Sequence, residues 1–87
     1  MMTLRLRAED LSWQELGSEI VVLDLRSSKY FVINGSGARL WERLAADAST
    51  DDLAEELEAT YALPPATARE HASDFIDDLR RKGLLDS

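Results

Sequence analysis

The sequence predicts an α+β fold in which a small antiparallel sheet is followed by three helices. Residues 20–33 form two β-branched and aromatic runs joined by Ser27-Ser28, the pattern of a β-hairpin. From residue 34 onward, apolar residues recur at helical spacing in three segments separated by turn and helix-breaking residues. Because the strands precede the helices instead of alternating with them, the helices are expected to cover one face of the sheet.

The length and composition predict a single domain that spans residues 1–87. The chain is 45% hydrophobic, which is enough for a packed core, and it contains no cysteine, which excludes disulfides and thiolate metal sites. The first ten residues, MMTLRLRAED, contain no apolar run typical of a signal peptide, and no segment is long enough to span a bilayer. A soluble cytoplasmic protein is therefore expected.

The strands are expected in the first third of the chain. Residues 3–7 and 12–16 alternate and predict one or two short strands, and Gly17-Ser18 predicts a turn. Residues 19–25 form the next strand and residues 30–33 the return strand. If Asp24 marks the solvent side, alternation places one set of residues toward the helices, namely Val21, Leu23, Leu25, Phe31 and Ile33. The opposite face then carries an apolar patch of Ile20, Val22, Tyr30 and Val32.

Three amphipathic helices are expected after the strands. Asn34 or Ser36 can cap the first helix, and Ser49 or Thr50 can cap the second. The third helix is expected to start at Pro64-Pro65 and to end at Gly83. The predicted core residues of the three helices are Ala38, Leu40, Trp41, Leu44 and Ala45; Leu53, Leu57 and Tyr61; and Ala68, Ala72, Phe75, Ile76 and Leu79.

The second strand of the hairpin, residues 30–33, is expected to lack a partner on one side. An unpaired strand offers its backbone N–H and C=O groups to any extended peptide, and neighbouring pockets can then select alternate side chains. We therefore take peptide binding by strand addition as the leading hypothesis.

Catalysis is not indicated by any group of residues. His71 is the only histidine, so the chain cannot form a histidine cluster, and the adjacent acidic pairs do not converge when they lie on helices. Gly35-Ser36-Gly37 is too short for a phosphate-binding loop and is not followed by lysine. The sequence predicts a binding protein without cofactor or metal, and not an enzyme.

An ordered set of residues resembles the PqqD-like family, the RiPP recognition elements. It comprises the run VLDLRSSKYF at residues 22–31, then Asn34, Gly37-Ala38, Trp41 and Gly83-Leu84-Leu85, and it extends over most of residues 13–86. Ser28 stands where the family often has glycine at the hairpin turn. The resemblance implies a winged-helix-like fold with a three-stranded antiparallel sheet and three helices. This chain is most similar to the leader-binding proteins of split lasso-peptide leader peptidases.

That resemblance also implies partners and a site. The leader of a ribosomally synthesised precursor peptide would add a strand beside residues 30–34 and place apolar side chains against the third helix. The expected peptide-binding residues are Tyr30, Phe31, Val32, Ile33, Asn34, Ala72, Ile76, Leu79 and Arg80. Of the helix residues, Ile76 and Arg80 are expected to line the groove, and Phe75 and Leu79 to belong to the core. The patch around Ile20 and Val22 is expected to dock the second partner, a leader peptidase or another modifying enzyme.

The alternative is a winged-helix DNA-binding protein that reads DNA with its third helix. The formal charge is −7, from 17 acidic and 10 basic residues, whereas phosphate contacts need a basic surface. The third helix mixes Glu70, Asp74, Asp77 and Asp78 with Arg69, Arg80, Arg81 and Lys82. Neither nucleic acid nor an anionic membrane is therefore expected as a partner.

Overall fold

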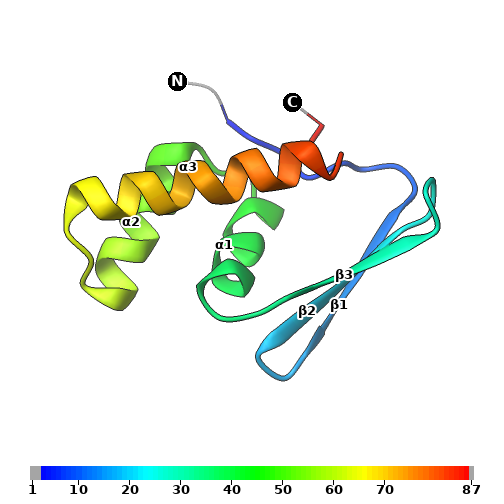
Figure 1. Cartoon of the computed structure of the whole chain (residues 1–87), viewed down its shortest axis with the longest axis horizontal. Coiled ribbons are helices and arrows are strands. Elements are labelled where there is room, and N and C mark those ends of the chain that lie inside the picture. Colours follow the sequence, from blue (N-terminus) through cyan, green and yellow to red (C-terminus); the bar gives the residue numbers. More distant parts are fainter. Residues whose placement is uncertain (1–2, 87) are drawn as a thin grey trace.

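A computed structural model describes residues 3–86 and contains three strands followed by three helices (Figure 1). The strands are β1 (Leu11–Leu16), β2 (Glu19–Asp24) and β3 (Lys29–Ile33), and the helices are α1 (Ser36–Ala45), α2 (Thr50–Tyr61) and α3 (Pro65–Arg81). The predicted α+β order is confirmed.

The three strands form one antiparallel sheet in the order β1-β2-β3. Gly17 and Ser18 connect β1 to β2, and Gly17 has a φ of +63°. A glycine with positive φ at the first of two loop residues is typical of a type II′ turn, whose twist suits a tight hairpin. Ser28, with a φ of +58°, occupies the left-handed region just before β3. Glycine adopts this conformation without strain.

The prediction of which β2 residues face the helices is wrong by one residue. Ile20 and Val22 are almost fully buried, and they pair with Ile33 and Phe31 on the inner face. Val21 and Leu23 therefore point to the outer face, where Leu23 is 46% exposed. The orientation predicted for β3 is correct, because Phe31 and Ile33 pack against the core whereas Tyr30 and Val32 are exposed.

The error arises at Asp24, which was expected to mark the solvent side of β2 but is a buried carboxylate. Its Oδ1 accepts a 2.6 Å hydrogen bond from Nη2 of Arg7, and both side chains are less than 10% exposed. The Arg7 guanidinium and further donors at Ser27 and Arg26 lower the pKa of Asp24 from 3.8 to about 2. A charged residue can occupy the inner face when it is paired in this way.

Arg7 also connects the N-terminal segment to the residues that follow α3. Besides the bond to Asp24, it donates to the carbonyl oxygens of Glu9, Asp10 and Gly83, the last at 2.7 Å. The predicted short strand at residues 3–7 does not join the main sheet. Instead, Leu4 and Leu6 form isolated antiparallel bridges with Ala48 and Leu85. This arrangement holds the segment after α3 against the end of β2.

The ends of the helices follow the local sequence. α1 has Gly35 at its N-cap without a side-chain cap, so the prediction of Asn34 or Ser36 is wrong. α2 begins with a capping box between Ser49 and Asp52, and α3 begins at Pro65. At the end of α3, the N–H of Leu84 donates to the Leu79 carbonyl and Gly83 has a φ of +73°, which is a Schellman motif. The motif turns Leu84 back into the core, where it is fully buried.

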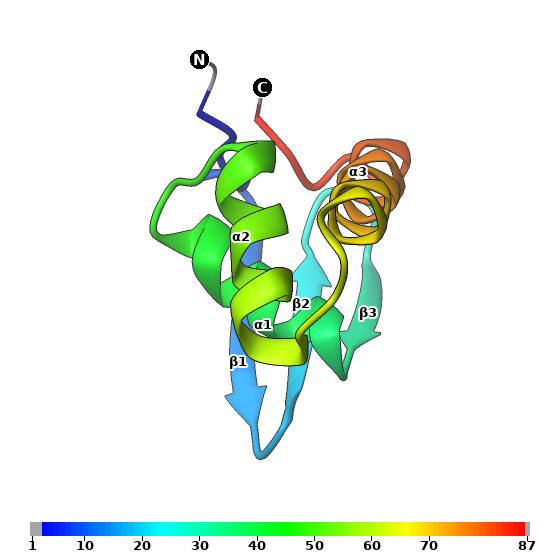
Figure 2. The same ribbon diagram turned by 90° about the vertical axis from the view of Figure 1, so that its left-hand side faces the viewer.

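α1 and α3 stand in different relations to the sheet (Figures 1 and 2). α1 lies over the inner face, where the fully buried Trp41 meets Trp13 of β1 edge to face, with ring centroids 6.0 Å apart. α3 packs on α2, and Figure 2 shows it on the same side of the molecule as β3.

Candidate functional site

β3 is an edge strand, because it pairs with β2 and has no second strand on its other side among residues 3–86. Hydrogen-bonded and non-bonded pairs alternate in an antiparallel ladder, and the tight turn makes Leu16 and Glu19 a bonded pair. Consistent with this, the N–H of Leu25 donates to the Asp10 carbonyl at 2.9 Å. Residues 19, 21, 23 and 25 therefore bond to β1, whereas the residues between them bond to Phe31 and Ile33 of β3. The backbone N–H and C=O groups of Tyr30 and Val32 point away from β2. They are therefore available to an added strand.

A groove runs between this edge and α3. Its volume is about 230 Å³. It is lined by Phe31, Val32, Ile33, Asn34, Gly37, Phe75, Asp78, Leu79, Lys82 and Leu84. A Cβ atom on Gly37 would lie 3.1 Å from Cγ2 of Ile33 and 3.4 Å from Cε1 of Phe75. The missing side chain of Gly37 thus lets α1 approach the groove without filling it.

The groove has a charged rim at the end of α3. Nζ of Lys82 donates to Oδ2 of Asp78 at 2.6 Å and lies 5.4 Å from the centroid of the Phe31 ring. Nη2 of Arg81 lies 3.5 Å from Oδ1 of the same Asp78 carboxylate. Most of the other lining residues are apolar, so the groove has an apolar floor and a charged rim of Asp78 and Lys82, with Arg81 beside Asp78 outside the lining.

The structure brings together five of the nine residues predicted for peptide binding: Phe31, Val32, Ile33, Asn34 and Leu79. The Tyr30 backbone lies on the same edge, but its side chain is 69% exposed on the outer face.

The structure corrects the predicted helix face at four residues. Ala72 and Ile76 are buried against the core, at 0% and 3% exposure, and Arg80 is exposed outside the groove. Phe75, predicted as core, is half-buried in the groove wall. The core stripe of α3 is Ala68, Ala72, Ile76 and Leu79, so Phe75 lies one position to its side.

Five groove residues were not predicted from the sequence: Gly37, Phe75, Asp78, Lys82 and Leu84. Phe75, Asp78 and Lys82, together with Leu79, recur three and four residues apart on α3, which places them on one helix face. This spacing is the signal that could have identified them, but it does not show which face of the helix meets β3.

The outer face of the sheet carries exposed apolar side chains. They include Leu23, Tyr30 and Val32, which are 46%, 69% and 51% exposed, and the partly buried Val21. The prediction that Ile20 and Val22 dock a partner on this face is wrong, because both side chains are buried on the other side of the sheet.

Residues 3–86 contain no group of three or more histidine, cysteine or acidic side chains arranged to hold a metal ion. Within the same residues, no helix is both long and apolar enough to cross a membrane.

The fold is similar to two solved structures. One is described as "TbiB1 in Complex with the TbiA(beta) Leader Peptide", with a TM-score of 0.89, 23% sequence identity and coverage of 95% of both chains. The other is described as "Lasso peptide synthetase B1 complexed with the leader peptide", with a TM-score of 0.85, 26% identity and coverage of 97% of this chain and 98% of the other.

No curated protein matches the sequence. Residues 19–85, which include β2, β3 and all three helices, match the family described as "Coenzyme PQQ synthesis protein D (PqqD)". The match covers more than half of the chain, and it includes both walls of the groove. The chain belongs to the PqqD family.

Proposed function

We propose that this protein binds the leader region of a ribosomally synthesised precursor peptide as an additional antiparallel strand on β3. The observation that carries the proposal is the edge strand itself, whose outward backbone groups at Tyr30 and Val32 border an apolar groove. Strand addition obtains affinity from backbone hydrogen bonds and specificity from pockets for alternate side chains. Both similar structures hold a leader peptide, which supports this choice of ligand.

The direct test is a titration of the purified protein with the leader peptide of a precursor encoded beside its gene. We expect saturable binding with one leader per chain, and no binding of a scrambled peptide of the same composition. Equal binding of the two peptides would contradict recognition by strand register and pockets. Absence of binding to the leader would overturn the proposal.

We further propose that the protein presents the bound leader to a maturation enzyme, a leader peptidase of lasso-peptide biosynthesis. The outer face of the sheet suits this second contact, because Leu23, Tyr30 and Val32 expose apolar surface beside the edge where the leader would lie. One small protein would then hold the substrate with its edge and the enzyme with its face.

Two charge substitutions test the second contact. Leu23→Glu adds a charge to the outer face, and Tyr61→Glu adds the same charge to a comparably exposed aromatic residue of α2. We expect Leu23→Glu to keep leader affinity and to abolish processing in a reconstituted mixture, whereas Tyr61→Glu changes neither. Equal processing by the two variants would exclude the outer face as the enzyme contact.

A further inference from the structure

The two ends of the groove differ in chemistry. At one end, Ile33, Gly37 and Phe75 form an apolar site. At the other end, the Lys82 ammonium group lies over the Phe31 ring and contacts Asp78. A peptide strand that crosses the whole groove would meet both environments.

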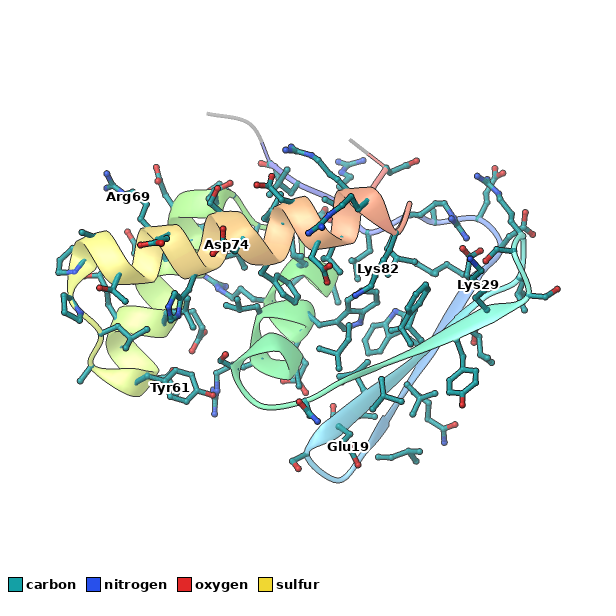
Figure 3. All side chains as sticks on the ribbon, viewed as in Figure 1. Glu19, Lys29, Tyr61, Arg69, Asp74 and Lys82 are labelled. Atoms are coloured by element: carbon teal, nitrogen blue, oxygen red, sulfur yellow. The ribbon has the colours of Figure 1, made fainter. Side chains whose placement is uncertain are left out.

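The charged end is locally cationic on an acidic chain. Asp78 is shared by Lys82 and Arg81, so this cluster already has one more positive than negative charge. Lys29 lies on the inner face of β3, two residues before Phe31, and has no ion-pair partner within 4.0 Å among the described residues. Figure 3 shows Lys29 at the start of β3, Lys82 between the end of α3 and β3, and Arg69 at the far end of α3.

The spacing of a strand determines which leader residues reach this end. Side chains on one face of a strand recur every two residues, about 6.8 Å apart. Ile33, Phe31 and Lys29 have this spacing on β3. An antiparallel leader runs from Ile33 toward Lys29, so a side chain at the apolar site is followed two and four residues later by side chains near Phe31 and Lys29.

We infer that Lys29 and Lys82 bind a leader carboxylate located two to four residues C-terminal to the side chain that fills the apolar end of the groove. This inference rests on the proposed function and deepens it. A leader strand would cover Lys82 and partly remove it from water, which is unfavourable unless a further anionic partner is supplied. A carboxylate supplies that partner, and a basic side chain at the same place is repelled. The contact would favour one direction and register of the leader, as charged groups often do at interfaces.

Three single substitutions test the inference with the leader that binds in the titration above. Lys29→Gln and Lys82→Gln each remove one charge from the cationic end, and Arg69→Gln removes the same charge from an exposed position elsewhere on α3. We expect each lysine variant to weaken binding about threefold to fivefold at low salt and Arg69→Gln to have no effect, because exposed ion pairs contribute modestly. The differences should shrink at 1 M salt.

A leader variant completes the test. Each acidic residue of the leader is replaced in turn by glutamine, and its effect is measured with wild-type protein and with Lys82→Gln. One replacement in the stated window should weaken binding to wild-type protein and have little further effect on Lys82→Gln. The inference would be overturned if the effects of the leader replacement and of Lys82→Gln were additive, or if all three protein variants lost the same affinity. A tightly binding leader without an acidic residue in the window would also overturn it. Each of these results leaves the proposed function intact. Thermal melts of each variant verify folding.

Discussion

β1 and β3 are the two edge strands of one sheet, and the side chains around them differ. β3 borders the groove formed with α3, and Phe31 and Ile33 line it. On the inner face of β1, by contrast, the carboxyl group of Glu15 lies beside that of Glu42, and a hydrogen bond between the two groups, together with their mutual repulsion, raises the pKa of Glu15. An inward-pointing charge on an edge strand discourages pairing with another strand. Both edges are unpaired, but only β3 has neighbouring side chains that leave room for an added strand.

Proline substitutions at the two edges should differ most strongly in their effect on leader affinity. Alternation in the ladder directs the N–H groups of Val32 in β3 and Glu15 in β1 away from the sheet. Val32→Pro removes a donor to the leader and restricts φ, so we expect leader affinity to fall about 30-fold or more. Glu15→Pro makes the same change at the other edge and should alter affinity less than about twofold. Calorimetric titration measures both, and equal losses would show that the leader does not distinguish the edges.

Truncation of neighbouring residues on α3 should separate binding from stability. Phe75→Ala removes part of the groove wall, and we expect leader affinity to fall about tenfold with a modest loss of stability. Ile76→Ala leaves a cavity in the core and should cost about 2–4 kcal/mol of unfolding free energy. Denaturant unfolding and leader titration of both variants provide the comparison. The opposite ranking would mean that Ile76, and not Phe75, faces the leader.

Filling the groove from α1 should weaken binding without harming the fold. Gly37→Ala places a methyl group close to Ile33 and Phe75 in the groove, whereas alanine is a better helix former than glycine. We expect leader affinity to fall several-fold and the melting temperature to stay within a few degrees of the wild-type value. A variant that binds the leader as well as wild-type protein would show that this end of the groove is not occupied.

The smallest expected effects concern pH, and they have opposite signs at the two ends of the sheet. Asp24, with a pKa lowered to about 2, stabilises the fold above about pH 4, and this contribution is lost as the pH falls toward 2. Glu15 has a raised pKa, so its ionised form is unfavourable in the fold, and stability should increase as the pH falls from neutral toward 4.5. Glu15→Gln should therefore melt higher than wild type at pH 7, with the difference shrinking near pH 4. A constant difference would exclude the carboxylate pair as its cause.

The contrast between the two edges was only partly predictable from the sequence. The order of elements, the unpaired β3 and the apolar residues of that strand follow from local patterns, because a strand of alternating side chains can be recognised by itself. The orientation of β2 does not follow from local patterns. It depends on Asp24, whose carboxylate can be buried because it pairs with Arg7, 17 positions away in the sequence. The groove wall on α3 shows the same limit. Phe75 and Ile76 are adjacent apolar residues, and the packing of α3 on α2 decides which of them remains accessible.

Amide hydrogen exchange with and without the leader peptide shows whether a leader strand adds to β3. We expect the amides of Tyr30 and Val32 to exchange rapidly in the free protein and to become protected when the leader is bound. The amides of Trp13 and Glu15, which point away from the sheet at the β1 edge, should exchange equally fast in both states. Strand addition to β3 would be wrong if the leader protected the β1 amides, or if it bound and left Tyr30 and Val32 unprotected.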